Sequence, residues 1–355
     1  MKLNKMHCYI CKALTGIVKR LSVLTFDYEI FFDGQNDLEH LITKTQKLTD
    51  IANHQSVPLS FFIDIAYLEA LKRCGFEPEY KRIKDQLNWL STCGHELQFH
   101  WHPHWVTSSW NADENCWNFN KSDYSWNGFV QNHGINKMIQ AIKDCLEIFK
   151  IEFNIVPCAF RMGGLAIEEP QHYLKTIEDL GFTIETSIFP GFYKECKFFT
   201  TDHRKHPEKT HWKIDSQTGC FQEHQQGRIL ELPISQAITK ELDFFKKASL
   251  SINYRWLKWS SQEEEGTGAQ SPMNLGVKKE ILPRTASLDK ADRATKMLFR
   301  SVTEQIWENG ADFVIWLNHP KSLNLYSWSA LRDYIEWVKN NGGQLITIET
   351  LKNKL

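Results

Sequence analysis

Apolar runs alternate with amphipathic segments along most of the chain. Residues 21–27 (LSVLTFD) form a continuous apolar run that ends in an acid, which is typical of a strand buried on both faces of a parallel sheet. Residues 37–55 then carry leucine and isoleucine at helical spacing, and residues 57–65 (VPLSFFIDI) predict a second buried strand. Strand and helix taking turns in this way indicate a parallel sheet or barrel.

The same alternation continues to the C-terminus. Further helices are predicted over residues 81–92, 134–150, 171–181 and 290–310, and further strands over residues 95–100, 156–162, 182–190 and 312–320, before a helix, a strand and a helix over residues 328–355. Three segments interrupt the pattern, and we expect them to be long loops: residues 105–133, 191–227 and 258–294. The third contains SSQEEEGTGAQSP, which has the composition of a mobile segment. We therefore expect a single domain over residues 20–355 with three insertions, after an N-terminal extension of residues 1–19.

Charge, cysteine content and hydropathy narrow the class of protein. The chain has 42 Lys and Arg against 43 Asp and Glu, and so lacks the basic excess that a nucleic-acid partner would favour. Its 9 cysteines are scattered without the even spacing of a disulfide framework, which favours reduced thiols in the cytoplasm. The sequence predicts neither a signal peptide nor the run of about 20 apolar residues that a transmembrane segment needs. Aromatic residues make up 13% of the chain, and their flat side chains suit a carbohydrate ligand.

Polar side chains at the predicted strand ends are the candidates for chemistry. In parallel α/β folds the carboxyl ends of the strands meet at one edge, and ligands bind there. The positions in question hold two acids, an arginine and three histidines: Asp27, Glu29, His100, His104, Arg161 and His319. These side chains are the components of a hydrolytic metal site.

The spacing of His100 and His104 lets both imidazoles reach one metal ion if the segment forms a helical turn. Asp27 and Glu29 lie two residues apart and share one face of a continued strand, so either can supply an oxygen ligand. Two carboxylates in one site usually have different roles: one stays ionised while the other exchanges protons. The alternative is structural, with the histidines as polar tips of a half-buried aromatic belt and Glu29 as a loop acid.

Five motifs, taken in order, resemble those of the NodB-homology polysaccharide deacetylases, carbohydrate esterase family 4. The motifs are LTFDYE (24–29), GHELQFHWHPH (94–104), FRMGG (160–164), FTIETSIFPG (182–191) and WLNHP (316–320). Residues 57–64 and 227–235 are similar to barrel strands of the same family. The resemblance covers residues 20–355 apart from the insertions, and it rests on the order of the motifs, since each alone is a weak signal.

The resemblance implies a distorted (β/α)7 barrel that binds a divalent metal, with Zn²⁺ as the expected ion. Its chemistry is metal-assisted hydrolysis of an N-acetyl or O-acetyl group on a sugar. Carried onto this sequence, Asp27 is the general base, Arg161 holds that base, and His319 is the general acid. His100 and His104 match the two metal-binding histidines.

Three positions depart from the family pattern. Tyr28 stands where the family has a metal-binding Asp, so we assign the third metal ligand to Glu29, with Asp27 as the alternative. Trp101 replaces a Ser or Thr, and the hydrogen bond of that hydroxyl has to come from elsewhere. Glu185 stands where an Asp is common, which leaves the acid that orients the general acid unassigned.

The sequence thus favours a metal-dependent deacetylase acting on a sugar of a cell-surface polysaccharide or its precursor. Two alternatives stay open. One keeps the barrel and the metal but cleaves a non-sugar amide, and the other is a sugar-binding relative that has lost turnover. The presence of both a candidate base, Asp27, and a candidate acid, His319, favours an enzyme over a binding protein.

Overall fold

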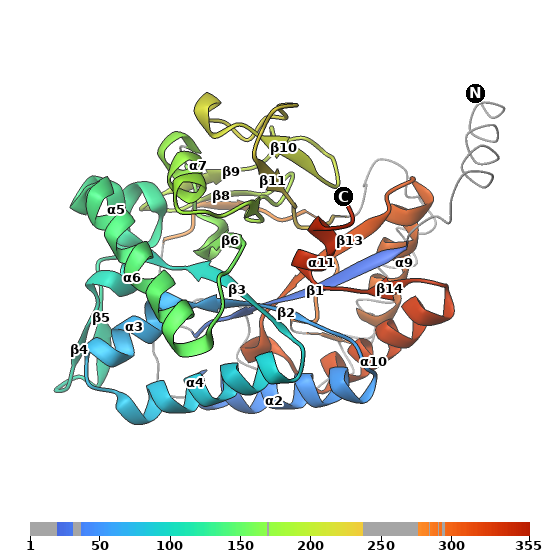
Figure 1. Cartoon of the computed structure of the whole chain (residues 1–355), viewed down its shortest axis with the longest axis horizontal. Coiled ribbons are helices and arrows are strands. Elements are labelled where there is room, and N and C mark those ends of the chain that lie inside the picture. Colours follow the sequence, from blue (N-terminus) through green and yellow to red (C-terminus); the bar gives the residue numbers. More distant parts are fainter. Residues whose placement is uncertain are drawn as a thin grey trace.

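The structure is a computed structural model that describes residues 20–30, 37–168, 170–236, 276–283, 285–289, 291–292 and 295–355. The predicted N-terminal extension and the segment SSQEEEGTGAQSP lie outside these residues. The described part of the chain is built around one curled sheet with helices packed outside it (Figure 1).

The main sheet has 9 strands, and its backbone path runs β10-β11-β7-β6-β3-β2-β1-β13, with β14 also paired to β1. The strands are β1 (Leu21–Tyr28), β2 (Ser60–Asp64), β3 (Glu96–Trp101), β6 (Ala159–Met162), β7 (Ile184–Glu185), β10 (Trp212–Ile214), β11 (Ile229–Glu231), β13 (Phe313–Asn318) and β14 (Gln344–Leu345). Neighbouring strands from β11 to β13 are all parallel, whereas β10 runs antiparallel to β11. β14 is parallel to β1 as well, so the carboxyl ends of all the strands of this sheet except β10 point to the same side.

The chain just after β11 closes the sheet against β13. The backbone N–H of Ser235 donates to the carbonyl of Ile315 at 2.9 Å, and the N–H of Ile315 donates to Oγ of Ser235 at 2.8 Å. Hydrogen bonds across this gap, in place of a regular strand pair, make a distorted barrel. The predicted distorted (β/α) barrel is confirmed.

Helices cover the outside of the sheet, with α2 and α4 below it and α5 and α6 at the left in Figure 1. Besides α5, the described α-helices are α2 (Asp37–His54), α3 (Ile65–Arg73), α4 (Glu77–Thr92), α6 (Ile135–Phe153), α7 (Pro170–Asp179), α9 (Thr295–Glu308), α10 (Leu325–Asn340) and α11 (Ile348–Lys352). Within the residues that the structure describes, no helix combines the length and the apolar character needed to cross a bilayer.

All three predicted loops contain some regular structure. The first insertion contains a hairpin of β4 (Ser109–Asn111) and β5 (Cys116–Asn118), the short 3₁₀ helix η2 (Lys121–Tyr124) and α5 (Trp126–His133). The second contains β8 (Tyr193–Glu195), β9 (Thr200–Asp202) and β10, and the third contains β12 (Lys279–Ile281), which pairs with β8. The prediction of loops was wrong because aromatic packing supplies the order: Trp110 and Trp117 face each other across the hairpin at 5.5 Å and both contact Phe76.

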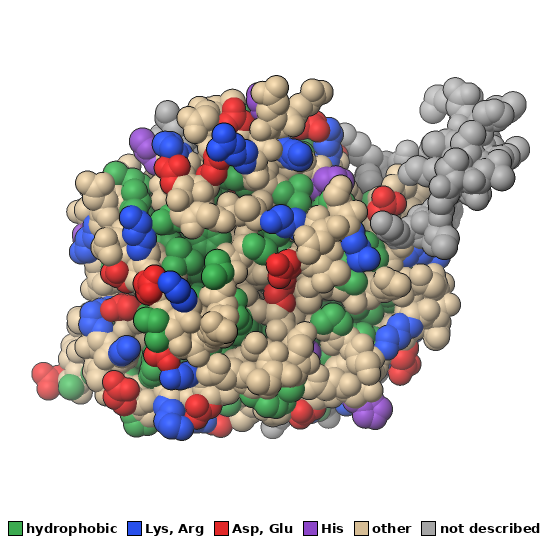
Figure 2. Space-filling model, viewed as in Figure 1, with side chains coloured by type: hydrophobic (Ala, Val, Ile, Leu, Met, Phe, Trp, Pro, Cys, Tyr) green, Lys and Arg blue, Asp and Glu red, His purple; other side chains and the backbone are tan. Residues whose placement is uncertain are grey.

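The surface carries charges of both signs. On the face seen in Figure 2, the Lys and Arg side chains of the described residues are interspersed with Asp and Glu and do not gather into a field of one sign. This distribution agrees with the formal net charge of -1 for the whole chain. The face seen in Figure 2 therefore offers no field of positive charge for a polyanion such as nucleic acid.

Candidate functional site

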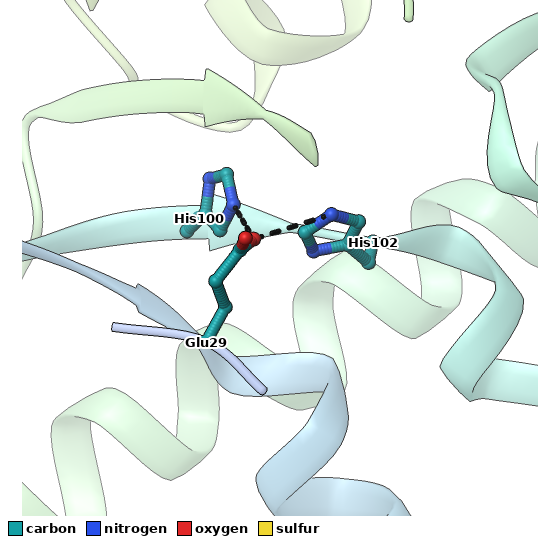
Figure 3. A group of neighbouring side chains, drawn as sticks. All are labelled: Glu29, His100 and His102. Carbon is teal, nitrogen blue, oxygen red and sulfur yellow. Dashed lines mark hydrogen bonds and ion pairs between the residues drawn. The ribbon is translucent and has the colours of Figure 1, made fainter. Parts of the chain in front are cut away.

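Glu29, His100 and His102 meet at the carboxyl ends of β1 and β3 (Figure 3). Oε2 of Glu29 lies 2.9 Å from Nε2 of His100 and 3.3 Å from Nε2 of His102. All three side chains are nearly buried, and the relative exposure of Glu29, the most accessible, is 9%. Among the described residues they form the group whose ligand atoms lie close enough to hold a metal ion.

The alternation of an extended backbone puts these side chains on one face. His100 belongs to β3, and His102 directly after it still has extended dihedrals, with φ -114° and ψ 102°. Asp27 and Glu29 lie on a common face in the same way, as the sequence predicted: their carboxylates approach Nε2 of His100 to 3.8 and 2.9 Å. Tyr28 between them points away from the site, and its hydroxyl donates to Oε1 of Gln86 at 2.8 Å.

The imidazoles of His100 and His102 are each oriented by a hydrogen bond at Nδ1, the nitrogen that does not face Glu29. Nδ1 of His100 lies 3.1 Å from the carbonyl oxygen of Arg161, which can only accept, so Nδ1 carries the proton. Nδ1 of His102 lies 3.1 Å from Oδ2 of Asp64, which also accepts from Nε1 of Trp105 at 2.9 Å. The two Nε2 atoms therefore direct lone pairs at a carboxylate oxygen, and such an arrangement requires a cation, either a proton or a metal ion, between them.

The donor set fits a divalent metal such as Zn²⁺. Two imidazole nitrogens and one carboxylate oxygen are the ligands of many catalytic zinc sites, which keep a fourth position for water or substrate. Ligand atoms in a tetrahedral zinc site lie roughly 3.3 Å apart, close to the 2.9 and 3.3 Å found around Oε2 of Glu29. Histidine ligands that donate their second N–H to a carboxylate or a carbonyl are typical of metal centres.

Positive charge surrounds the carboxylate of Glu29. Burial alone would raise its pKa, but Lys321, His102 and His100 together hold the pKa of Glu29 well below its usual range. Nζ of Lys321 lies 2.9 Å from Oε1, the oxygen that does not face the imidazole of His100. Glu29 is therefore ionised and ready to bind a cation.

Arg161 holds the second carboxylate of the site. Its Nη1 donates to Oδ1 of Asp27 at 2.6 Å and to Oγ1 of Thr25 at 3.0 Å, and its Nε and Nη2 donate to the carbonyl and hydroxyl oxygens of Thr186. Its guanidinium group also lies 3.8 Å from the ring centre of Phe62. The arginine is fully buried, so the ion pair is desolvated and its geometry is fixed by several contacts. The other oxygen of Asp27 stays directed at the site.

His319 lies opposite the metal-binding group and is oriented by Asp289. Its Nδ1 is 2.6 Å from Oδ2 of Asp289, and its backbone N–H donates to Oδ1 at 2.7 Å. Nε2 of His319 lies 3.9 Å from Oδ2 of Asp27 and 3.6 Å from Oε1 of Glu29. Burial lowers the pKa of His319, but Asp289 and the two site carboxylates raise it to about 9. The imidazole is therefore protonated at neutral pH.

Glu185 does not orient His319. Its carboxylate accepts hydrogen bonds from the hydroxyl of Tyr173 at 2.7 Å and from the backbone N–H of Ser187 at 2.9 Å, outside the site. The acid that sequence reasoning left unassigned is instead Asp289, which lies in the third predicted insertion.

His104 is not in the group formed by Glu29, His100 and His102. The helical turn expected from His100 to His104 is wrong, because β3 continues to Trp101 and the 3₁₀ turn η1 (Pro103–Thr107) begins only after His102. The ring of His104 stacks on Tyr124 at 5.6 Å, and burial, followed by the charge of His102, lowers its pKa well below the usual value. The structure thus brings His102 to the position expected for His104.

Glycines in the motif FRMGG make room for this arrangement. A Cβ atom on Gly163 would overlap the imidazole of His102, and one on Gly164 would overlap the Tyr124 ring. Gly164 also has a positive φ of 57°, which favours glycine. The backbone after β6 can therefore pack closely against the imidazole of His102.

Sequence reasoning missed four residues of the site. His102, Asp289 and Lys321 contact predicted residues, and Asp64 binds His102. The signal for His102 was available, because a histidine two residues from His100 shares its face on a strand. Asp64 ends an apolar run just as Asp27 does, and that position could have been weighed in the same way.

Comparison with known proteins supports the fold. No family model matches the chain, and no curated protein matches it. A protein from Mycobacterium smegmatis assigned as a polysaccharide deacetylase has a similar crystal structure, with a TM-score of 0.53 and 14% identity over 95% of this chain and 91% of that one. The crystal structure of Puue allantoinase gives a TM-score of 0.50 and 12% identity over 92% of this chain and 87% of that one. At such identities the likeness shows the fold, which agrees with the resemblance drawn from the motifs.

Proposed function

We propose that the protein is a metal-dependent hydrolase that removes an acetyl group, most readily an N-acetyl group, from a sugar of a polysaccharide or its precursor. The observation that carries the proposal is the convergence of Nε2 of His100 and Nε2 of His102 on Oε2 of Glu29, at 2.9 and 3.3 Å. Asp27 and His319 flank that point with a base and an acid. Motif order and fold support the same family of reactions.

Glu29, His100 and His102 would hold the metal, for which Zn²⁺ is the expected ion. When bound, the ion would polarise the acetyl carbonyl and make a water molecule more acidic. Asp64 and the carbonyl of Arg161 keep the two Nε2 lone pairs directed at the ion, because each binds the corresponding Nδ1–H.

Asp27 acts as the general base. Arg161 occupies Oδ1 of Asp27 and leaves Oδ2 directed at the site, 3.8 Å from Nε2 of His100. Oδ2 accepts a proton from the water molecule as its oxygen attacks the acetyl carbon. The guanidinium group stabilises the carboxylate in its charged form, which is the form that accepts the proton.

His319 acts as the general acid. Asp289 binds its Nδ1, so the proton available for transfer lies on Nε2, the nitrogen that faces Asp27 and Glu29. Nε2 gives this proton to the leaving nitrogen of the sugar as the C–N bond breaks, and the products are acetate and a free amine. Because the imidazole is charged at neutral pH, the acid is in the required form before the reaction begins.

A second candidate reaction is hydrolysis of a non-sugar amide with the same groups. The likeness of the fold to Puue allantoinase favours this second reaction, because that protein is named for an activity on a different substrate. A panel of acetylated sugars and small cyclic amides, with release of acetate and ring opening followed in parallel, distinguishes the two.

Metal content and turnover together test the proposal. The purified protein should bind one equivalent of Zn²⁺ and release acetate from at least one acetylated sugar. His100→Ala and Glu29→Gln should lose both properties, whereas Asp27→Asn should keep the metal and lose turnover. Metal binding and acetate release that both survive His100→Ala would refute the proposal. Ligand affinity without any turnover in the metal-loaded protein would favour a sugar-binding relative instead.

A further inference from the structure

Lys321 is a buried lysine that the motifs do not predict. It lies in the 3₁₀ turn η6 (Pro320–Ser322), two residues after His319, and only 1% of its surface is exposed. An ammonium group is rarely buried unless it is paired, because it loses its hydration. The pairing here is with Oε1 of Glu29, at 2.9 Å from Nζ.

The two oxygens of Glu29 therefore have different partners. Oε1 faces Nζ of Lys321 at 2.9 Å and, at the longer distance of 3.6 Å, Nε2 of His319, whereas Oε2 faces the Nε2 atoms of His100 and His102. A glutamate reaches further than an aspartate and has one more rotatable bond, so an unrestrained Glu29 could turn either oxygen, or both, towards a metal. The ammonium group removes that freedom.

The turn that carries Lys321 is itself fixed. Nζ of Lys44, in α2, donates to the carbonyl oxygen of Lys321 at 2.8 Å, and η6 packs against α2. The side chain of Lys321 is therefore directed at Glu29 by the backbone of the barrel, and its place does not depend on the metal.

We propose that Lys321 is a positioning residue that restricts Glu29 to binding the metal through Oε2 alone. The inference rests on the proposed metal site. Its ammonium group also competes with the metal for the charge of the carboxylate. Removing it should let Glu29 offer both oxygens and should tighten metal binding, by about tenfold for the loss of one nearby positive charge.

Cobalt spectroscopy tests this role without relying on turnover. Co²⁺ absorbs visible light more strongly in a four-coordinate site than in a site with more ligands, so the spectrum reports how many oxygens Glu29 supplies. The wild-type protein, Lys321→Met and Lys321→Gln should be titrated with Co²⁺, and their Zn²⁺ dissociation constants measured by competition with a chelator. Lys143→Met, at an exposed position of α6, is the matched control, because it removes a lysine ammonium group without touching Glu29 or the turn η6.

We expect both Lys321 variants to bind one Co²⁺ with a weaker visible band and to bind Zn²⁺ about tenfold more tightly. The control Lys143→Met should stay close to wild type. Circular dichroism shows which variants are folded, and either folded variant decides the question. A wild-type spectrum and affinity in the folded variant would overturn the role of Lys321, provided that Glu29→Gln abolishes binding. If the wild-type protein binds no Co²⁺, or Glu29→Gln binds it unchanged, the metal site itself is refuted, and the role of Lys321 with it.

Discussion

Nδ1 of His319 lies 2.6 Å from Oδ2 of Asp289, and this contact joins the residue just after β13 to the end of the third insertion. The same carboxylate accepts the backbone N–H of His319 at 2.7 Å. Two hydrogen bonds from one residue to one carboxylate fix both the ring orientation and the tautomer. The acid function proposed for His319 therefore depends on Asp289.

Asp289→Asn should lower the pKa of His319 from about 9, because the substitution removes the nearest negative charge. Since a raised histidine pKa keeps the ring protonated, its loss shortens the pH range over which the acid is charged. We expect the alkaline limb of the kcat profile to move at least about one pH unit lower, and kcat at pH 8 to fall about 10-fold to 100-fold. NMR titration of the His319 ring in the metal-free protein measures the pKa directly. Asp179→Asn, at an exposed helix position, is the control, and an unchanged His319 pKa in Asp289→Asn would contradict the assignment.

His102→Ala should weaken metal binding, whereas His104→Ala should leave it intact. His102 directs Nε2 at Glu29, whereas the ring of His104 packs on Tyr124. Loss of one of three protein ligands should weaken Zn²⁺ binding by at least about 100-fold, while His104→Ala should keep one equivalent of zinc despite some loss of stability. Zinc content after dialysis and a chelator titration measure this. The reverse result would mean that a helical turn from His100 to His104 forms when the metal binds.

Gly163→Ala should impair the metal site with little effect on the rest of the fold. A Cβ atom at Gly163 would overlap the imidazole of His102, and His102 would have to move away from Glu29. We expect metal affinity to fall by about 10-fold to 100-fold, as for other changes that disturb the orientation of a ligand. Thermal unfolding of the metal-free variant serves as the control, because a general packing defect would lower the melting temperature as well. Wild-type affinity in the variant would show that His102 has room to adjust.

The strand ends were predictable because the rule behind them is topological. Once the apolar runs are read as parallel strands, Asp27, Arg161 and His319 have to lie at one edge of the barrel, however far apart they are in sequence. The two-residue period of a strand likewise places Glu29 beside Asp27. These inferences need only the existence of each strand.

Predicting His102 rather than His104 as the second histidine ligand requires the position at which β3 ends, and not only the existence of the strand. It depends on whether β3 ends before or after Trp101, and the sequence pattern does not define the end of a strand to a single residue. The sequence did not predict Asp289, for a different reason. Its neighbours in sequence have the composition of a loop, and its role comes from a contact with a residue 30 positions away. Tertiary contacts of this kind leave no periodic pattern.

Glu231 provides a test of stability that is separate from the metal site. It is paired in register with Glu185 across β11 and β7, and both are fully buried. Burial, followed by the charge of Glu185, raises the pKa of Glu231 well above its ordinary value of 4.5. The folded protein thus holds a proton on this side chain that the unfolded chain releases above about pH 4.5.

The sign of the pH dependence follows from that difference. Because the pKa is raised on folding, the stabilisation is complete below the unfolded pKa and is lost as the pH rises towards the folded value, by at most about 1.4 kcal/mol per pH unit for one proton. Glu231→Gln cannot ionise, so the decline in unfolding free energy between pH 5 and pH 9 should be shallower than in wild type by up to that slope. Urea denaturation at a series of pH values measures it, with Glu147→Gln at an exposed position of α6 as the matched control. Equal slopes in wild type and Glu231→Gln would mean that the proton is not held by this pair.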